Sequence, residues 1–488
     1  MEKILSVEMM SVADKYTTNN FINQNDLIMK VGKTLYDNYS FDNKNILIVV
    51  GKGNNGNDGL ALAYYLLKNN HKVSIYLTSD NDNYFINLVK PFNPIFVDIN
   101  NDFNQYDIIV DAIFGIGLKN KLPEDMNNLI DKINNTKAYV ISIDINSGLN
   151  ATSGIATNAI KSDLTIAINN YKSGHFLNDA KDYIKELIVI DVGITSPNND
   201  SYYLYETSLD DIFKPRKQNS HKGSFGNVAI MGGNVRYSGS IKLASMSLVS
   251  LICGAGLSRI IVPSCIVNML GKYVLESTIF PIESDNCGFV YNQNDLEKAI
   301  SNVNSLAFGM GLSDNYVENE KILDYILNNY SGNLLIDADG LNTLSNMDLD
   351  ILNKSKAHIV LTPHIKEFSR LIKIDVNTIK QDPCKYVLEF TRKYNVILLL
   401  KGTCSLVSYK DSLYFINEGS VSLSKGGSGD ILSGIICGFM AYKDILEAVL
   451  DGSYLFGYVG NICQNKYGTY ASLPRDTINE LKNIIKNY

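Results

Sequence analysis

The sequence predicts an α/β protein with two domains in tandem, and three observations support this. The chain has 488 residues, which is more than one hydrophobic core usually serves. Short apolar runs alternate with segments of helical periodicity, as expected for parallel strands joined by crossover helices. A polar, turn-rich stretch at residues 195–222 interrupts this series and marks a domain junction.

The first series of apolar runs predicts one doubly wound, Rossmann-like domain at residues 1–212. Residues 58–68 have the apolar spacing of an amphipathic helix between the first two strands. The predicted strands are Asn45–Val50, Val73–Leu77, Ile108–Phe114, Tyr139–Ile145, Leu164–Ile168 and Leu187–Val192.

The second series predicts another α/β domain at residues 213–488. A hairpin is expected around Lys410-Asp411, and two helices, Asp430–Tyr442 and Ala448–Gln464, are predicted to close the chain. The predicted strands are Val228–Met231, Ser258–Val262, Leu306–Gly309, Leu334–Asp337, His358–Leu361 and Val396–Leu400, followed by Cys404–Tyr409 and Leu413–Asn417 in the hairpin.

Composition excludes several classes of protein. A net charge of -7 with no basic run argues against a nucleic-acid partner. No uncharged run reaches the roughly 18 residues of a membrane helix, and no signal peptide opens the chain. The seven cysteines are widely spaced and show no CxxC pairing, which argues against disulfides and zinc sites. We expect a reduced, cytoplasmic protein that does not contact membranes.

A glycine-rich segment, Lys425-Gly426-Gly427-Ser428-Gly429-Asp430, runs directly into the first of the two closing helices. Glycines allow close approach of the backbone, and a helix N-terminus offers free N–H groups to a phosphoryl group. Asp430 is the predicted catalytic base. The alternative is that Asp430 only caps the helix. The segment lacks the Gly-Lys-Ser/Thr of a Walker loop.

This segment, with Lys401-Gly402-Thr403, Thr362-Pro363-His364, Asp337-Ala338-Asp339-Gly340 and His221-Lys222-Gly223-Ser224-Phe225-Gly226, resembles the ADP- or ATP-dependent NAD(P)H-hydrate dehydratases of the ribokinase-like superfamily. The resemblance covers roughly residues 215–485 and implies a ribokinase-like fold, with Mg²⁺ bridging the nucleotide oxygens. It implies that ADP phosphorylates the C6 hydroxyl of hydrated NADH or NADPH, after which phosphate leaves.

The resemblance also assigns site residues to this half of the chain. The implied substrate contacts are Ser240, Gly311, His364 and Asp430, and Ser240 stands where the family usually has Ala. The implied ADP and AMP contacts are Lys401, Gly402, Thr403, Cys404, Ser405, Gly427, Ser428 and Gly429. From the residues alone, the glycine after Lys401 is equally well explained as a turn, and His364 as a structural hydrogen-bonding residue.

A second glycine-rich loop, Gly51-Lys52-Gly53-Asn54-Asn55-Gly56-Asn57-Asp58, follows the first strand and opens a helix. Such a turn is a usual place for a phosphate or dinucleotide. A tight turn built from Asn and Gly is the alternative. No acidic residue ends the next strand, as a ribose-binding residue of a Rossmann domain would.

This loop, with Val110-Asp111-Ala112-Ile113-Phe114-Gly115 and Asp144-Ile145-Asn146-Ser147-Gly148, resembles the NAD(P)H-hydrate epimerase domain, which interconverts the two C6 hydrates. The resemblance implies a K⁺ held by Asn55, Asp111 and Ser147, with Asp144 and Lys172 as catalytic groups. Capping after a strand is the alternative for Asp111 and Asp144. The implied substrate contacts are Asn54, Asn55, Gly56, Asn57, Asp58, Gly115, Ile116, Gly117, Leu118, Lys119, Asn120, Lys121 and Asp144.

Three positions depart from the epimerase pattern. Asn57 replaces a glycine, Asn146 replaces a proline, and Met29-Lys30 stands where the family has Met-Glu. The leading hypothesis is a bifunctional repair enzyme that forms homo-oligomers. The rivals are a small-molecule kinase that uses Asp430, and an N-terminal domain that binds a ligand without catalysis.

Overall fold

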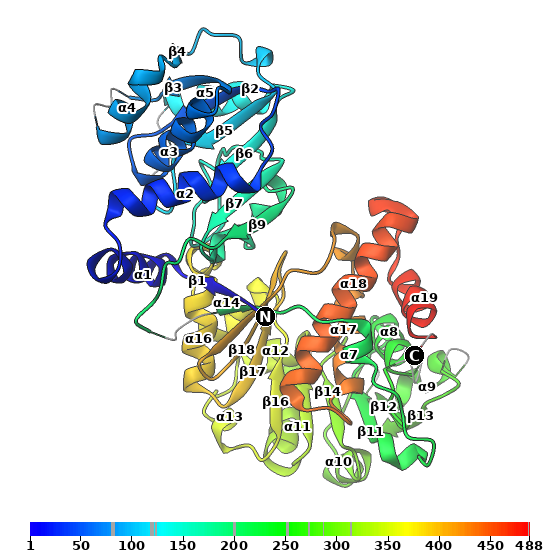
Figure 1. Ribbon diagram of the computed structural model, residues 1–488. Helices are drawn as coiled ribbons and strands as arrows, with labels where there is room; N and C mark the ends of the chain where they lie inside the picture. Colours follow the sequence, from blue (N-terminus) through cyan, green and yellow to red (C-terminus); the bar gives the residue numbers. More distant parts are fainter. Residues whose placement is uncertain are drawn as a thin grey trace. The chain divides into compact units, whose positions relative to one another are not determined.

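The computed structural model describes the chain except residues 80–82, 118–121, 123, 199–201, 250–252, 272–273, 286, 313–314 and 487. It forms two compact units, Glu2–Tyr203 and Leu204–Tyr488 (Figure 1). Residues 204–212 therefore belong to the second unit, although the sequence analysis placed them in the first. The reason is packing: Tyr205 N donates to Phe415 O at 2.9 Å, the Tyr205 hydroxyl donates to Asp451 at 2.5 Å, and Ile212 lies in the second core.

The N-terminal unit contains a seven-stranded sheet in the order β4-β3-β2-β5-β6-β7-β9, with every ladder parallel. This confirms the six predicted strands and adds the edge strand β4. The strands are β2 Asn45–Val50, β3 Lys72–Leu77, β4 Ile95–Val97, β5 Ile108–Ala112, β6 Tyr139–Ile143, β7 Leu164–Ile168 and β9 Leu187–Ile190; the short β1 Glu2–Leu5 pairs with β8 Tyr171–Lys172.

Helices cover both faces of this sheet because its strands are apolar on both sides. In β2, Ile46 and Ile48 join the core under α2 and α3, whereas Leu47 and Val49 pack with α5. Alternate residues of a strand point to opposite faces, so a continuous apolar run requires a layer on each side. The helices are α1 Val7–Asn20, α2 Gln24–Asn38, α3 Asn54–Lys68, α4 Tyr84–Val89, α5 Glu124–Asn134 and α6 Ala180–Tyr183, with 3₁₀ turns at Lys90–Phe92, Phe103–Gln105 and Ser173–His175.

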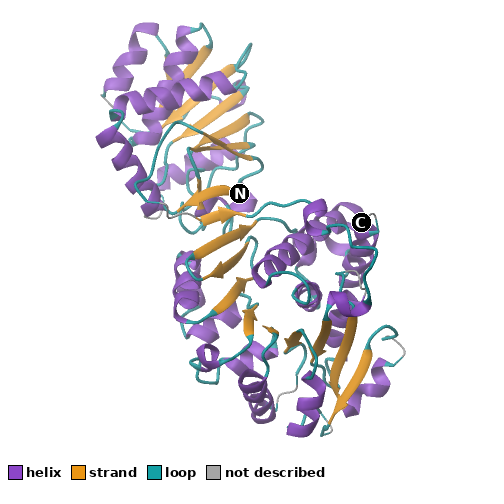
Figure 2. Cartoon of the chain, turned by 60° about the horizontal axis from the view of Figure 1, so that its bottom comes forward, coloured by secondary structure: helices purple, strands orange, loops and turns teal. Residues whose placement is uncertain are grey.

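The C-terminal unit has parallel strands in the order β13-β12-β11-β14-β15-β16-β17, extended by the antiparallel hairpin β18-β19. Figure 2 shows this sheet with helices on both sides. The predicted strands and hairpin are confirmed, and β13 is an addition. The strands are β11 Asn227–Met231, β12 Leu257–Pro263, β13 Thr278–Ile282, β14 Ser305–Phe308, β15 Asn333–Ile336, β16 His358–Leu361, β17 Val396–Leu400, β18 Ser405–Tyr409 and β19 Ser412–Ile416; β10 is Tyr202–Leu204.

The C-terminal end of this unit differs from the prediction. The expectation of two closing helices was wrong, because a third helix, α19, follows and buries Ile478 and Leu481 in the core. Helices α8, α17, α18 and α19 pack on one another. The helices are α7 Leu209–Ile212, α8 Ser238–Val249, α9 Val267–Leu270, α10 Gln293–Ile300, α11 Tyr316–Asn329, α12 Asp339–Leu344, α13 Ile351–Lys354, α14 Ile365–Ile372, α15 Val376–Gln381, α16 Pro383–Lys393, α17 Ser428–Phe439, α18 Ile445–Ala471 and α19 Pro474–Ile485, with 3₁₀ turns at Lys222–Phe225, Ser264–Ile266 and Val421–Leu423.

Among the described residues, no helix is both long and apolar enough to span a membrane. The seven cysteines are all free thiols, as the sequence analysis predicted.

Candidate active sites

A cavity of about 670 Å³ lies at the carboxyl end of the N-terminal sheet. Residues of helices α1 and α2 line it, as do residues of the loops that follow β2, β5 and β6. Ligands of open α/β sheets bind at this end because the strand-to-helix loops gather there. Of the predicted residues, the cavity is lined by Asn54, Asn55, Asp58, Gly115, Ile116, Gly117, Asp144 and Lys172.

The glycine-rich loop is the first turn of helix α3, which begins at Asn54 rather than near residue 58. Gly56 can only be glycine, because an added Cβ would lie 1.9 Å from the Gly51 carbonyl oxygen. The Asn54 side chain accepts a hydrogen bond from Gln24 at 3.0 Å. The loop therefore presents helix N–H groups and polar side chains to the cavity.

Asp144 and Lys172 form a buried ion pair on the floor of this cavity. Lys172 also donates to Ile168 O at 2.9 Å, and Ile168 N donates to Asp144 Oδ1 at 3.3 Å. Asp144 has a left-handed φ of 67°, a strained conformation for a non-glycine residue that is common at functional sites. The structure thus joins two predicted catalytic residues that are far apart in the sequence.

His175 forms hydrogen bonds with the backbone of both residues of this ion pair. Its Nε2 lies 2.7 Å from Asp144 O, and its Nδ1 accepts a hydrogen bond from Lys172 N at 3.0 Å. Because Nδ1 is an acceptor, Nε2 carries the proton and donates to Asp144 O. Burial and the nearby Lys172 lower the pKa of His175 to about 4, so the imidazole is neutral. Sequence reasoning did not identify His175, although it lies in the same segment as Lys172.

The three residues that the resemblance implied for K⁺ are connected by hydrogen bonds, and one of them, Asn55, lines the cavity. Asp111 accepts hydrogen bonds from Ser147 Oγ at 2.6 Å and from Ser142 Oγ at 2.9 Å. Phe114 N donates to Ser147 Oγ, and Asn55 Nδ2 donates to Phe114 O, both at 2.9 Å. Burial raises the pKa of Asp111, and no basic side chain among the described residues pairs with it.

These residues fit an alkali cation. Asn55 Oδ1 is buried without a hydrogen-bond partner in the described part of the chain, which is costly for a carbonyl oxygen. An oxygen-only donor set of amide, carboxylate and hydroxyl suits a hard cation. Such a cation would satisfy Asn55 Oδ1 and offset the buried charge of Asp111.

Some predicted contacts lie elsewhere. Asn57 Oδ1 accepts a hydrogen bond from Asn83 at 2.8 Å, and Asn57 does not line the cavity. Leu118, Lys119, Asn120 and Lys121 lie outside the described residues. Asn146 donates to Ile160 O at 2.8 Å and accepts from Thr165 at 2.5 Å, so this departure from proline is accommodated by buried hydrogen bonds.

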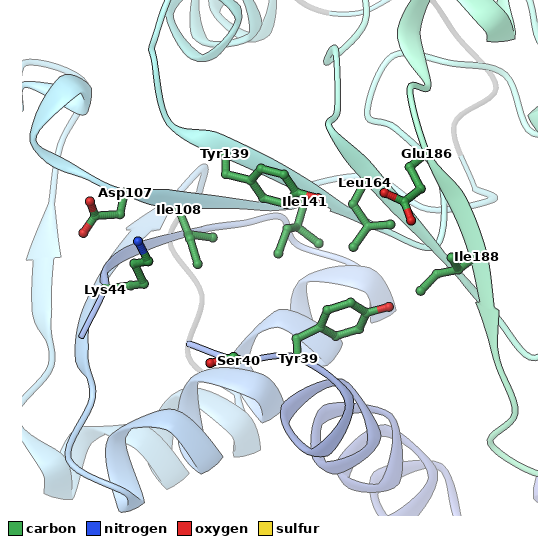
Figure 3. Close-up of a pocket in the computed structure, with 10 residues that line it drawn as sticks. All are labelled: Tyr39, Ser40, Lys44, Asp107, Ile108, Tyr139, Ile141, Leu164, Glu186 and Ile188. Carbon is green, nitrogen blue, oxygen red and sulfur yellow. The ribbon is translucent and has the colours of Figure 1, made fainter. Parts of the chain in front are cut away.

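Another cavity, of about 430 Å³, opens at the opposite end of the same sheet, where the strands begin (Figure 3). Ile108, Ile141 and Leu164 form its floor, and Tyr39 and Tyr139 flank them. None of its lining residues was predicted to act in a site. The carboxyl-end cavity therefore remains the candidate site of this unit.

In the C-terminal unit, the glycine-rich segment forms the turn that enters α17. Gly427 is the N-cap residue with a left-handed φ of 96°, and Asp430 lies in the first turn. The capping interpretation of Asp430 is therefore wrong, because its carboxyl group instead hydrogen-bonds the Ser240 hydroxyl. Burial, reinforced by the charge of Asp337, raises the pKa of Asp430 to about 6. A carboxyl group with this pKa can accept a proton near neutral pH.

Ser240 and Gly311 lie beside each other near this base. Gly311 has a φ of 68°, and a Cβ added to it would lie 3.2 Å from Ser240 Cβ. The structure thus brings together three predicted substrate contacts, Ser240, Gly311 and Asp430. Ser240 also supplies a hydroxyl donor that the usual alanine would lack.

Lys401 is held beside the glycine-rich turn by a buried carboxylate that sequence reasoning left without a role. Lys401 Nζ lies 2.7 Å from Asp337 Oδ1, and Ser433 Oγ donates to Asp337 Oδ2 at 2.6 Å. A Cβ added to Gly429 would lie 3.6 Å from Lys401 Nζ. The ammonium group therefore sits next to the N–H groups of α17, as an anion site requires.

His364 caps helix α14 and adjoins Lys401. Its Nδ1 accepts hydrogen bonds from the N–H groups of Lys366 and Glu367 at 3.1 Å, and its backbone bridges to Lys401. Burial and Lys401 lower the pKa of His364. The structural alternative for His364 is thus present. Its other nitrogen, Nε2, lies 3.6 Å from Glu367 Oε1, and half of the His364 side chain is exposed.

The remaining predicted nucleotide contacts follow Lys401 or begin α17. Gly402 and Thr403 are exposed, and Ser405 starts β18. Cys404 and Ser428 are buried, so they can offer mainly backbone groups to a nucleotide.

Lys425, the first residue of the glycine-rich segment, does not face the anion site. It donates hydrogen bonds to the carbonyl oxygens of Tyr470 and Ser472 at the end of α18. Lys425 therefore tethers the loop. Near Asp430, the described residues hold no cluster of three metal-ligating side chains. A Mg²⁺ that arrives with nucleotide oxygens would need only one or two carboxylates from the protein.

Comparisons with known proteins match both units. Residues 16–174 match the family described as the YjeF-related protein N-terminus, and residues 228–483 match NAD(P)H-hydrate dehydratase. A bifunctional NAD(P)H-hydrate repair enzyme of Dictyoglomus turgidum is 31% identical over 90% of this chain and 88% of its own length. The chain belongs to the family of bifunctional NAD(P)H-hydrate repair enzymes.

The Escherichia coli member of this family is 27% identical over 91% of the chain and 85% of its own length. A solved ribokinase-like superfamily protein from Enterococcus faecalis covers 59% of the chain and 96% of its own length, with a TM-score of 0.50 and 23% identity. This likeness shows the fold of the C-terminal unit, which confirms the ribokinase-like prediction.

Proposed function

We propose that this protein repairs hydrated NADH and NADPH through two activities. The N-terminal unit epimerises the R and S hydrates at C6, and the C-terminal unit dehydrates the S form with ADP, which yields AMP and phosphate. The observation that carries this proposal is Asp430, which lies behind a glycine-rich helix N-terminus and beside Lys401, in a chain whose family match spans both units.

The dehydration requires a better leaving group than water. Asp430 accepts the proton of the C6 hydroxyl while that oxygen attacks the terminal phosphorus of ADP, and AMP departs. The C6–O bond then breaks, phosphate leaves, and the N1 lone pair forms an N1=C6 double bond. Loss of a proton from C5 forms the C5=C6 bond and returns the lone pair to N1, which gives NADH.

The residues around Asp430 have separate tasks in this scheme. The N–H groups of Gly427–Gly429 and the Lys401 ammonium stabilise negative charge on the transferred phosphoryl group. Residues 401–405 hold the adenylate. Ser240, Gly311 and His364 contact the hydrated ring. Mg²⁺ would supply charge neutralisation between the phosphates.

In the N-terminal unit, the helix N-terminus at Asn54–Asp58 binds the substrate, and Asp144 with Lys172 acts at the ring. K⁺, held by Asn55, Asp111 and Ser147, would supply positive charge beside the bound substrate. We further propose that the protein is cytoplasmic, forms homo-oligomers, and binds neither nucleic acid nor membranes.

The test is the production of NADH from each purified hydrate. With the S hydrate and ADP, NADH absorbance should appear; if ADP is consumed without NADH, the small-molecule kinase is the better description. ATP in place of ADP identifies the nucleotide. With the R hydrate, NADH should appear at a similar rate; clearance only at the uncatalysed epimerisation rate would make the N-terminal unit a binding module.

A further inference from the structure

Asp14 is an acidic residue that faces the N-terminal cavity and has no role in the scheme above. It lies on helix α1, before the residues 16–174 that match the family model. Asp14 lines the cavity together with Met10, Ser11 and Thr18. Their spacing of three to four residues places them on one face of α1, so this face of the helix is a wall of the substrate cavity.

Asp14 and the buried ion pair come from different elements and line the same cavity. Asp14 enters from helix α1, whereas Asp144 and Lys172 enter from the loops at the sheet edge. Lys172 and Ile168 N occupy Asp144 Oδ1, while Oδ2 lies 3.4 Å from where a Cβ of Gly115 would be. One carboxylate oxygen of Asp144 therefore lies beside Gly115, another residue of the cavity lining.

The surroundings of the Asp14 carboxyl group favour its protonated form. In the part of the chain that the structure describes, neither a hydrogen bond nor an ion pair is formed by this carboxyl group. Burial raises the pKa of Asp14 to about 6; Lys172 opposes this shift and Asp144 adds to it. The other charged groups that line the cavity are Lys15, Lys52 and Asp58, and Asp58 also has a raised pKa through burial.

We propose that Asp14 is the acid of the epimerase site, protonating the C6 hydroxyl from the α1 side while Asp144 acts from the sheet side. This inference rests on the proposed epimerase function and assigns its chemistry.

The steps balance as follows. The Asp14 proton moves to the C6 oxygen, the C6–O bond breaks, and water departs as the N1 lone pair forms an N1=C6 double bond. A water molecule then adds to C6 from the opposite face, the N1=C6 pair returns to N1, and Asp144 accepts the proton of the added water. Each catalytic passage inverts C6 and moves one proton across the site, so solvent exchange or the reverse passage restores the starting state.

Two separate carboxylates are useful because inversion at C6 requires that the hydroxyl leave from one face and that water enter from the other. The first step needs an acid, and the second step needs a base. General acid catalysis of this kind contributes about 10²–10⁴-fold to a rate.

The experiment compares Asp14→Asn with Glu8→Gln in the full-length protein. Glu8 is an exposed acidic residue of the same helix, outside the substrate cavity. Epimerisation of the R hydrate is followed by NMR in the absence of ADP, and dehydration of the S hydrate with ADP is measured in the same preparation. We expect Asp14→Asn to slow epimerisation at least about 100-fold and to leave dehydration unchanged. Glu8→Gln should change neither.

Two further measurements separate an acid from a structural or binding residue. The Asp14→Asn protein should bind the S hydrate in the N-terminal unit with wild-type affinity, by calorimetry in a background of Asp430→Asn. The wild-type epimerisation rate should fall as the pH rises above about 6. The residual rate of Asp14→Asn should not fall in this pH range.

Wild-type epimerisation in Asp14→Asn, or loss of binding with the loss of rate, would overturn the role of Asp14 as the acid. Absence of epimerisation in the wild-type protein would contradict the proposed function instead.

Discussion

Asp430 shows how the surroundings of one residue set its chemistry. Asp430 is half-buried near Asp337, and its pKa is about 6, so its carboxyl group is ionised at neutral pH and is a strong enough base to accept a proton. Ser240 donates a hydrogen bond to it and opposes part of the increase. The same carboxylate at an exposed helix N-terminus would be a much weaker base.

We predict that Asp430→Asn slows NADH production from the S hydrate and ADP by about 10²–10⁴-fold, because the amide cannot accept the hydroxyl proton. In the wild-type protein, kcat/KM should decrease as the pH falls below about 6, since protonation removes the base. Ser240→Ala removes a hydrogen-bond donor that lowers the pKa of Asp430. In this variant, the decrease in kcat/KM should therefore begin at a higher pH. A pH profile in which Asp430→Asn keeps wild-type activity would contradict this assignment.

Lys172 carries a different kind of prediction, because its ion pair with Asp144 is buried. Lys172→Met leaves the Asp144 carboxylate without its cation, which typically costs about 3–5 kcal/mol. Unfolding of the N-terminal unit, followed by circular dichroism, should show this loss, and epimerisation should stop.

Lys185→Met is the matched control for Lys172→Met. Its ion pair with Asp163 is at the surface, with 77% of the Lys185 side chain exposed, so its loss should cost at most about 1 kcal/mol. Equal destabilisation by the two substitutions would show that the buried ion pair contributes no more to the free energy of unfolding than the surface ion pair.

At the level of elements, each site depends on a helix N-terminus that is fixed by other parts of its unit. The turn before α17 is held by Lys425, which bonds to carbonyl groups at the end of α18. A kink at Gly468, which has a left-handed φ of 76°, interrupts α18 just before these carbonyl groups. The order of the anion-binding loop therefore depends on the packing of α18 against α17.

We predict that Lys425→Met raises the KM for ADP about tenfold, because an untethered loop must be ordered on binding. The kcat at saturating ADP should change less, since Asp430 and Lys401 keep their own partners. Lys356→Met, an exposed change in the same unit, is the control. Steady-state kinetics with varied ADP decide this, and an unchanged KM would show that the tether does not affect binding.

At the level of the whole molecule, two units with separate sites predict separable activities. The Lys172→Met protein should dehydrate the S hydrate normally, and the Asp430→Asn protein should epimerise normally, because each unit has its own core. A mixture of the two variants should convert the R hydrate to NADH, since the S hydrate released by one protein is a substrate for the other. Failure of the mixture, with each single activity intact, would indicate direct transfer between sites of one chain.

The sequence alone determined the α/β class, the two-unit organisation and the position of most strands. Apolar runs of strand length that alternate with helical segments are compatible with few other fold classes. Glycine-rich turns before α3 and α17 were equally visible, since only glycine permits such close backbone approach. Short edge strands such as β4 and β13 were missed because β4 has only three residues and β13 contains Pro281, which argues against a strand.

Only the tertiary structure decided which distant residues act together. Asp144 with Lys172, Asp337 with Lys401 and Ser433, and Asp430 with Ser240 meet because separate strands and helices end at one edge of a sheet. The sequence did not identify Asp14 as a functional residue, because a single acidic residue on an amphipathic helix is common. Its partial burial at the cavity, which follows from the packing of α1, raises its pKa to about 6, as the acid that we propose requires.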